Sequence, residues 1–477
     1  MGADIQQDKK EHEIMKKLET PMEKLTTVFK WLYLIHIMFA GNSVIYDTPV
    51  EKITSVMVLG LGAIVVIWRF IHVKDYIRYP FIKLYAIFAA AFALTLLINW
   101  RYGWTANMKI LIWMTFQFVA LYAFDLNRSK ESVTKEFHIS LYIIIVYMSL
   151  ANLVSIVMLF ANYLQYRILD KNTTFLIGVA YWGRLYGVHT DPNYGAVLSV
   201  VAVMAALYMF IRAQKRWLKV LIAVSIFVQV TTMAFSASRT GMVTISVCLV
   251  IFFFIYAMTK GKKLVKSILI ALAAVVIVLA AEKGITLAYN GYTQIVAQFH
   301  SVDDSKKDND KELVKIGRDE ELSGDVSNRR FDLWENSVQI FKKSPVFGIG
   351  FGNIVSYSEA ELPDCYLLTN GFAIFNAFHN MIMDLIASQG VVGVLLFLAI
   401  IVSSLIYLIK NWKKIPQEDW LKCILLFSCC VGFMVSSMFV SQILYVNNQT
   451  TVVFWTMWGF LIYYVTKAVR KETVSEK

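Results

Sequence analysis

The chain has 477 residues, of which 57% are hydrophobic and 17% are charged, and its mean hydropathy is +0.56. Soluble domains carry about a quarter of charged residues, so this composition excludes a soluble globular protein and indicates an integral membrane protein. The net charge of +12 does not indicate nucleic-acid binding, because the basic residues lie in short connections between apolar runs, where they act as orientation signals.

Apolar stretches of roughly 20 residues, the length that crosses the hydrocarbon core, recur along the whole chain. No cleavable signal peptide is visible in the charged segment 1–25, and the apolar run after it is long enough to span the membrane. We therefore predict an all-α integral membrane protein with about twelve transmembrane helices. They lie near residues 26–46, 53–72, 80–99, 106–125, 138–162, 192–211, 217–236, 240–258, 264–282, 391–410, 421–441 and 449–467.

The lysine and arginine content of the connections alternates between rich and poor. The rich connections lie near residues 69–78, 128–135, 212–219, 260–266 and 410–414, and both terminal segments are also basic. Cytoplasmic loops carry the positive excess in membrane proteins. We therefore predict that both termini, including the tail 468–477, face the cytoplasm.

This orientation divides the chain into three parts besides its two terminal segments. They are a nine-helix membrane region, 26–282, a large extracytoplasmic loop between spans nine and ten, 283–390, and three C-terminal membrane helices, 391–467. A shorter outer connection lies near 163–191. Unusual polar residues gather at the outer ends of helices rather than in mid-span, which weakens the interpretation as a transporter.

The first part of the outer loop, 301–328, is highly charged and poor in apolar residues. It contains Asp308-Asn-Asp310, which looks like the acidic triplet with which many sugar transferases hold a divalent metal. No strand or apolar framework surrounds this triplet, so a solvated charge run is the preferred interpretation. We predict no metal site and no cofactor.

The second part of the outer loop predicts an amphipathic helix over residues 329–343, with Arg330 in its first turn. Its apolar stripe at helical spacing consists of Phe331, Trp334, Val338 and Phe341. A helix that lies on the membrane surface with a solvated Arg330 would explain the same pattern. The Gly348-x-Gly350 segment indicates a tight turn rather than a phosphate-binding loop, because it does not lie between a strand and a helix.

His379 begins the segment that leads into the tenth span. A helix from His379 to Lys410 would be roughly 48 Å long at 1.5 Å per residue, which exceeds the hydrocarbon core. We therefore expect the Gln389-Gly390 step to divide it and His379 to lie at the outer interface beside Asn380. A single histidine at a helix start is more often a cap or a satisfied polar group, so its position alone does not make it catalytic.

Two further arginines fall on the predicted outer face. Arg184-Leu-Tyr-Gly187 leads to Asp191-Pro-Asn193 before the sixth span, and Ser238-Arg239 lies in a tight hairpin between the seventh and eighth. An arginine in so short an outer hairpin opposes the positive-inside bias. Taken separately, each arginine could form a structural ion pair or contact lipid headgroups. Their presence on the same face as Arg330 and His379 favours a joint function.

In this order, the motifs resemble those of the O-antigen ligase and Wzy-type polysaccharide polymerase superfamily. The matching motifs are Arg184-x-x-Gly187, Asp191-Pro-Asn193, Ser238-Arg239, Arg330-x-x-x-Trp334 with Pro345 and Gly348-x-Gly350, His379-Asn380, and Gly390-x-x-Gly393. They cover residues 180–393, and the twelve spans with a late outer loop extend the resemblance to the whole chain. Each motif is weak alone, whereas the ordered set is fairly specific.

The resemblance implies a GT-C-like fold, similar to that of other polyprenyl-dependent membrane glycosyltransferases. It also implies an undecaprenyl-pyrophosphate-linked glycan as the donor at the outer leaflet. Arg239 and Arg330 would correspond to the essential arginines of the family, and His379 to its essential histidine. Because Arg329 directly precedes Arg330, either of the two could contact the substrate.

The chemistry of such a reaction agrees with these residue types. Guanidinium groups can bind a departing lipid pyrophosphate bidentately without a metal. A histidine, with an ordinary pKa of about 6.5, can accept the proton of the attacking hydroxyl. We therefore predict His379, Arg330 and Arg239 as catalytic residues of an inverting transfer. The predicted substrate-binding residues are Arg184, Asp191, Asn193, Arg329, Trp334 and Asn380, with Trp334 either stacking on a sugar or anchoring its helix.

The predicted function is polymerisation of lipid-linked oligosaccharide repeat units outside the bacterial plasma membrane, into capsular polysaccharide, exopolysaccharide or O-antigen. One alternative is ligase-type transfer of the glycan to a lipid or protein acceptor, and a more distant one is a flippase or exporter. Expected partners are the glycan donor and acceptor, membrane lipid, and a flippase and a chain-length regulator of the same pathway. Tyr181, Trp182 and Tyr186, near Arg184 and His189, form either a second glycan site or an interfacial belt.

Overall fold

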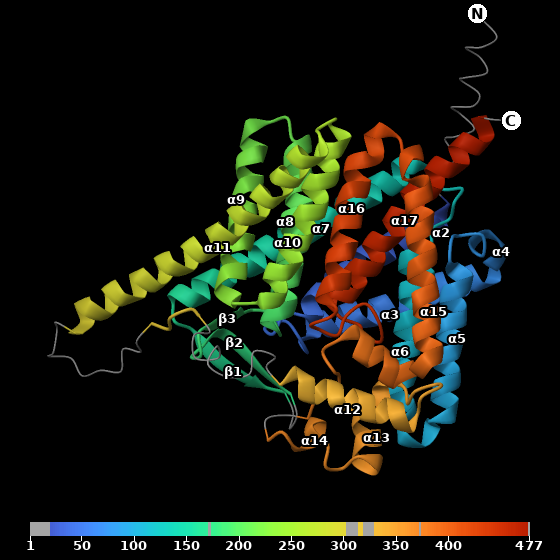
Figure 1. Ribbon diagram of the computed structural model, residues 1–477, viewed down its shortest axis with the longest axis horizontal. Helices are drawn as coiled ribbons and strands as arrows, with labels where there is room; N and C mark the ends of the chain where they lie inside the picture. The colour runs from blue at the N-terminus through green and yellow to red at the C-terminus, as the bar shows by residue number, and fades with distance from the viewer. Residues whose placement is uncertain (1–19, 170–172, 302–312, 318–328, 372–373, 476–477) are drawn as a thin grey trace, which may run out of the picture.

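The computed structural model of the protein describes residues 20–169, 173–301, 313–317, 329–371 and 374–475. It is predominantly helical (Figure 1). The longer helices are α2 (Pro21–Ala40), α3 (Pro49–Ile71), α5 (Ile82–Ile98), α6 (Trp104–Thr115), α7 (Lys130–Phe160), α8 (Pro192–Arg212), α9 (Arg216–Ser236), α10 (Arg239–Thr259), α11 (Leu264–Ser301), α12 (Arg330–Lys343), α15 (Met381–Asn411), α16 (Gln417–Ser436) and α17 (Gln449–Ser475).

Shorter elements connect these helices. They are α4 (Val73–Tyr76), α13 (Ile354–Glu361), α14 (Tyr366–Thr369), the π-helix η2 (Phe116–Tyr122) that continues α6, and the 3-10 turns η1 (Trp100–Tyr102), η4 (Phe351–Asn353) and η5 (Trp412–Lys414). Three antiparallel strands, β1 (Leu164–Ile168), β2 (Thr174–Ala180) and β3 (Arg184–Gly187), form a small sheet in the order β1-β2-β3.

Each of the twelve predicted positions is occupied by a helix. In the described part of the chain, nine helices are long and apolar enough to cross a membrane. The other three positions hold α2, the 17-residue apolar helix α5, and α6 with its continuation η2. The protein is therefore a multi-pass helical membrane protein, while the number of twelve spans stays a prediction.

Two boundaries differ from the prediction. Helix α11 does not end near residue 282 but continues to Ser301, so the connection between α11 and α12 begins later. The connection near 163–191 is not irregular but forms the sheet, which the all-α prediction missed. Strand β2 reads Thr-Phe-Leu-Ile-Gly-Val-Ala, a short apolar run rich in residues that favour strands. Val179 and Leu185 of the sheet pack with Leu159 of α7 and Phe235 of α9.

The predicted helix 329–343 is present as α12, but the predicted apolar stripe is not its core-facing side. Leu333, Ser337 and Ile340 are the residues buried against the rest of the protein, and Ser337 donates a hydrogen bond to the Met383 carbonyl of α15 (2.7 Å). Phe331, in contrast, is 64% exposed. The helix therefore has one face on α15 and a separate apolar face outside, as expected of a helix at a membrane interface.

The division of the tenth span at Gly390 is confirmed. Gly390 has φ 57° and ψ −154° inside α15, a conformation that glycine adopts readily. At this kink the backbone of the segment after α12 runs beside α15, and Ile349 donates to the Ala387 carbonyl while Val391 donates to that of Pro345, each at 2.8–2.9 Å. A side chain on Gly348 (φ 63°) would collide with the backbone of Ser388. The absence of side chains at Gly348 and Gly390 thus allows the two backbone segments to lie in close contact.

The sheet and helices α12–α14 lie at one end of the helical bundle, and α4 and the end of α17 lie at the other (Figure 1). The candidate site residues are all near the first of these ends.

Candidate active site

The first part of the site is the junction of β3 with α8. Arg184 is buried in β3 and donates hydrogen bonds to the Ser236 carbonyl (2.9 Å) and to Oδ1 of Asn193 (3.1 Å). Asp191 caps α8, and its Oδ1 accepts from the backbone N–H groups of Asn193 (2.6 Å) and Tyr194 (3.3 Å). A carboxylate at this position also complements the positive end of the helix dipole.

The second part is the start of α10. Ser238 caps this helix by accepting from the Gly241 N–H group, and its hydroxyl donates to Oδ1 of Asn193 (3.0 Å). The side-chain oxygen of Asn193, on α8, thus accepts hydrogen bonds from both β3 and the start of α10. Arg239, the first residue of α10, directly follows this cap.

Arg330, at the start of α12, meets the same group of residues. Burial lowers the pKa of its guanidinium, the Asp191 carboxylate raises it, and Arg239 and Arg184 lower it further. Arg330 therefore lies within electrostatic range of Asp191, Arg239 and Arg184. Strand β3 and helices α8, α10 and α12 therefore each contribute one charged group to a single cluster, which we call the arginine cluster (Arg184, Asp191, Arg239 and Arg330).

His379 lies at the edge of the arginine cluster. Burial lowers the pKa of its imidazole, with an opposing effect of Asp191 and a smaller lowering effect of Arg330. The side chain is partly exposed and meets the Phe375 ring edge-on at 6.0 Å. At neutral pH this imidazole is uncharged, because its pKa lies below the ordinary value of about 6.5. It is thus in the state that can accept a proton.

The backbone at His379 is held in an unusual conformation. His379 has φ 51°, which is rare for a residue with a side chain. Both backbone polar groups of the preceding residue, Phe378, are fixed, since the Trp334 indole N–H donates to the Phe378 carbonyl (3.1 Å) and the Phe378 N–H donates to Asp384 Oδ1 (2.9 Å). After it, Asn380 caps α15 through hydrogen bonds from Ile382 and Met383. Such strain at a site is maintained only where the surroundings determine it.

The indole N–H of Trp334 thus has a defined partner, while stacking of its ring on a sugar stays a prediction. The side chain connects α12 to the peptide that precedes His379, so it anchors its helix to the site through a specific hydrogen bond. Asp384 was not predicted as a site residue. Its signal in the sequence was a carboxylate within the first turn of an otherwise apolar helix, where an ionisable group is rare.

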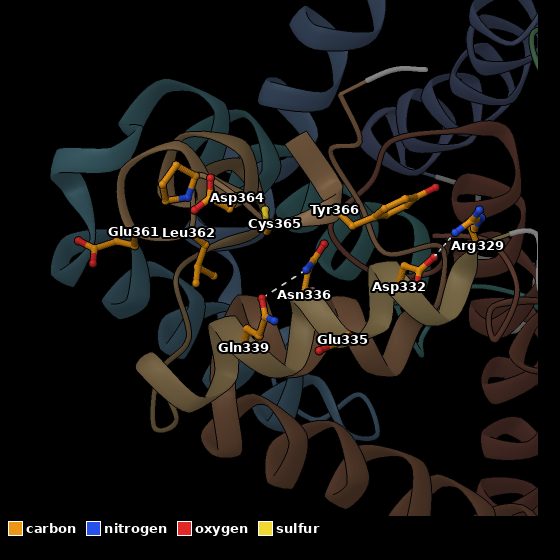
Figure 2. Close-up of a pocket in the computed structure, with 11 residues that line it drawn as sticks. Arg329, Asp332, Glu335, Asn336, Gln339, Glu361, Leu362, Asp364, Cys365 and Tyr366 are labelled. Atoms are coloured by element: carbon orange, nitrogen blue, oxygen red, sulfur yellow. Dashed lines mark hydrogen bonds and ion pairs between the residues drawn. The ribbon is translucent and has the colours of Figure 1, made fainter. Parts of the chain in front are cut away.

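The adjacent Arg329 lies apart from the arginine cluster. Its guanidinium is exposed and pairs with Asp332 at 3.5 Å. Arg329 lines a different cleft of about 520 Å³ between α12 and the α13–α14 connection, and Figure 2 shows its side chain beside Asp332 there. This cleft is lined by Arg329, Asp332, Glu335, Asn336, Gln339, Glu361, Leu362, Pro363, Asp364, Cys365 and Tyr366. Four carboxylates make it unsuitable for a pyrophosphate.

His189 is not available to a ligand. It is buried, burial lowers its pKa to about 4, and its Nε2 is hydrogen-bonded to Asn152 Oδ1 at 2.8 Å. Of the nearby aromatic residues, Tyr181 is exposed and packs edge-on against Trp182. The two basic residues of the alternative second glycan site are therefore both engaged elsewhere, since Arg184 belongs to the arginine cluster, and the choice between such a site and an interfacial belt stays a prediction.

The acidic triplet 308–310 lies outside the described residues. Among the residues that the structure describes, no three His, Cys, Asp or Glu side chains are grouped so that they could hold a metal ion.

Residues 224–398 match the family model described as O-antigen ligase, and this segment contains Arg239, Arg330 and His379. A protein of Haemophilus influenzae (strain ATCC 51907 / DSM 11121 / KW20 / Rd), named only as uncharacterized, is 25% identical over 261 residues. The similarity covers 54% of this chain and 58% of that relative, so the chain spans a little over half of the relative's length. Over residues 224–398 the chain is thus similar to the O-antigen ligase family, in agreement with the resemblance of its ordered motifs to the O-antigen ligase and Wzy superfamily.

Proposed function

We propose that the protein transfers a glycan from a polyprenyl-pyrophosphate carrier to a glycan acceptor, and that it polymerises lipid-linked repeat units. The observation that carries this proposal is the convergence of three arginines from β3, α10 and α12 beside a histidine with a lowered pKa. Guanidinium groups gathered in this way suit a pyrophosphate, which they can bind bidentately.

In the proposed reaction, the acceptor hydroxyl oxygen forms a bond to the anomeric carbon while the bond from that carbon to the pyrophosphate oxygen breaks. The electron pair of the broken bond stays on the pyrophosphate, where Arg239 and Arg330 stabilise the developing charge. The hydroxyl proton passes to His379. Direct displacement inverts the anomeric configuration. Because the arginines stabilise the leaving group, the proposal needs no metal ion.

The proposed polymerase differs from a ligase, its nearest alternative, in the acceptor of the glycan. A ligase would use the same donor and the same arginines but would transfer a glycan to a lipid or protein. An exporter of lipid-linked oligosaccharide would need charged groups in a central cavity open to either side. The arginine cluster lies instead at one end of the bundle, which favours a transferase over an exporter.

The test supplies purified protein with lipid-linked repeat units as the sole substrate. We expect a ladder of oligomers on the polyprenyl carrier, unchanged by a chelator and absent with His379→Ala. Strict dependence on an added divalent ion would contradict the metal-independent mechanism. If no oligomer forms until a lipid or protein acceptor is added, the ligase function is correct.

The proposal also needs the site to face outward from the bacterial plasma membrane, with both termini in the cytoplasm. Lys315 and Lys413 are exposed at the two ends of the molecule, and the five native cysteines are buried. We expect a membrane-impermeant thiol reagent to label Lys315→Cys in intact cells and to leave Lys413→Cys unlabelled. The opposite pattern would place the site in the cytoplasm and would contradict the proposed function.

A further inference from the structure

A separate cavity of about 290 Å³ lies between α3, α4, α5 and η2. It is found near α4, at the end of α5 remote from α12 and α13 (Figure 1). Most of its lining is apolar, and its two cationic residues are Arg69 and Lys83. The full lining consists of Arg69, Phe70, Val73, Tyr76, Ile77, Ile82, Lys83, Tyr85, Ala86, Ala89, Thr115, Phe118, Val119 and Ala123.

Arg69 is the feature of this cavity that indicates a ligand. It is only 4% exposed, and one of its terminal nitrogens donates to the carbonyls of Val119 and Ala123, at the end of the π-helix η2. Its Nε–H group is buried and has no hydrogen-bond partner among the described residues. Because a buried donor without an acceptor is unfavourable, a ligand with an acceptor oxygen would be stabilised here.

The charged residues around the cavity indicate which kind of hydrogen-bond acceptor a ligand would provide. No residue of its lining is acidic, and Lys83 of α5 is exposed at its edge. Glu136 and Asp125 also interact electrostatically with Arg69, but neither belongs to the lining. Lys74 and Arg78, in and after α4, add exposed positive charge at the same end, of which Asp75 of α4 offsets a part. An anionic group therefore complements this end of the cavity.

The apolar walls of the cavity indicate the chemistry of the part of the ligand that lies away from Arg69. Phe70, Ile77 and Ala86 are exposed side chains of the lining. In a helix bundle with lipid around it, such a groove opens sideways toward the acyl chains. A ligand that fits both parts has an anionic headgroup at Arg69 and Lys83 and an acyl chain along Phe70 and Ala86. Basic pockets between transmembrane helices on the cytoplasmic side commonly bind anionic headgroups.

We propose that this cavity binds an anionic membrane phospholipid that supports the packing of α3, α4 and η2. The phosphate accepts the Nε–H group of Arg69 and interacts with Lys83, and one acyl chain fills the apolar part. This site is independent of the arginine cluster and of the proposed function, because it lies at the other end of the bundle.

The test measures lipid that remains bound to the full-length protein after purification in mild detergent, by mass spectrometry of the extracted lipids. Ala86→Trp fills the apolar part, and Lys83→Glu reverses a charge at its edge, while Arg69 is left intact because it also binds η2. The matched controls on α11 are Ala273→Trp and Lys266→Glu, at exposed positions that line none of the cavities described here. We expect each cavity variant to lose at least half of the bound phosphatidylglycerol and each control to retain it.

A second measurement does not depend on how much lipid survives purification. Adding phosphatidylglycerol vesicles to the delipidated protein should raise its Tm, and phosphatidylcholine vesicles or inorganic phosphate alone should raise it less. The Tm rise should be lost in Ala86→Trp and kept in Ala273→Trp. Equal stabilisation by phosphatidylcholine or by inorganic phosphate would overturn the proposal, as would unchanged lipid retention in both cavity variants.

Discussion

The two ends of the helical bundle differ in how their buried cationic side chains are paired with carboxylates. At the end near α4, the carboxylate of Glu136 on α7 lies 3.1 Å from the ammonium group of Lys30 on α2 and is hydrogen-bonded to Arg128 and Thr27. Lys30 and Arg128 share this one carboxylate at hydrogen-bond distance, and the group packs α2 against α7. At the other end, Arg330 interacts with two further arginines and, among the described residues, with one carboxylate, Asp191.

This difference distinguishes a structural ion cluster from a ligand site. Buried cations that face a carboxylate at hydrogen-bond distance need nothing further. Guanidinium groups brought together by three separate elements repel one another, and this repulsion is reduced when an anion binds between them. We therefore expect substitutions at the Glu136 end to change stability and those at the arginine cluster to change transfer.

The largest effect is expected for Glu136→Gln, which leaves Lys30 and Arg128 buried without their carboxylate. Breaking a buried ion pair from one side costs about 3–5 kcal/mol of unfolding free energy, so we expect a large fall in Tm measured in detergent. Glu131→Gln, exposed on the same helix, is the matched control. If Glu136→Gln kept the wild-type Tm but lost glycan transfer, the structural assignment of this end would be wrong.

Arg330→Ala should reduce transfer on the order of 10²–10³-fold, because it removes a donor that stabilises charge on the leaving group. Arg330→Lys should restore only part of the rate, since an ammonium group cannot bind bidentately. The neighbouring Arg329→Ala should lower the rate by less than about threefold, because Arg329 faces the other cleft. Equal losses for Arg329→Ala and Arg330→Ala would contradict the distinction between these two arginines.

Trp334→Phe should lower kcat about tenfold while the protein still folds. It removes the hydrogen bond to the Phe378 carbonyl, worth about 1 kcal/mol, and loosens the peptide that orients His379. Trp420→Phe is the matched control, because it loses a similar bond, to the Ile415 carbonyl (2.7 Å), at the other end of the bundle. A positioning role predicts a change in kcat only for Trp334→Phe, whereas equal changes for both would indicate a general packing effect.

The smallest expected effect is on the pH dependence of kcat/KM. The pKa of His379 is lowered by burial, so its neutral form persists as the pH falls below the ordinary value of about 6.5. Since the proton acceptor must be neutral, kcat/KM should stay level down to that pH and fall only below it. Trp334→Phe, which admits water to His379, should move the fall to higher pH. An acid limb centred well above pH 7 would contradict the role of His379.

The sequence alone predicted most of the fold, because a transmembrane helix is determined locally. About 20 apolar residues must bury their backbone polar groups in their own hydrogen bonds, so the positions of the helices follow from composition. The same holds for the kink at Gly390, where helix length and a single glycine were sufficient. The sheet 164–187 was missed, because short apolar runs are ambiguous and tertiary contacts with α7 and α9 decide their conformation.

The candidate site was predicted residue by residue but not as an arrangement. Arg184, Arg239, Arg330 and His379 could be selected because polar residues at the outer ends of apolar helices are unusual, and their order resembled a family. Only the tertiary structure placed Arg329 in a different cleft from Arg330, because Arg329 precedes α12 with φ 62° and its side chain pairs with Asp332. It also decided that Trp334 and Asp384 hold the His379 peptide, because hydrogen bonds between α12 and α15 depend on how two distant segments pack.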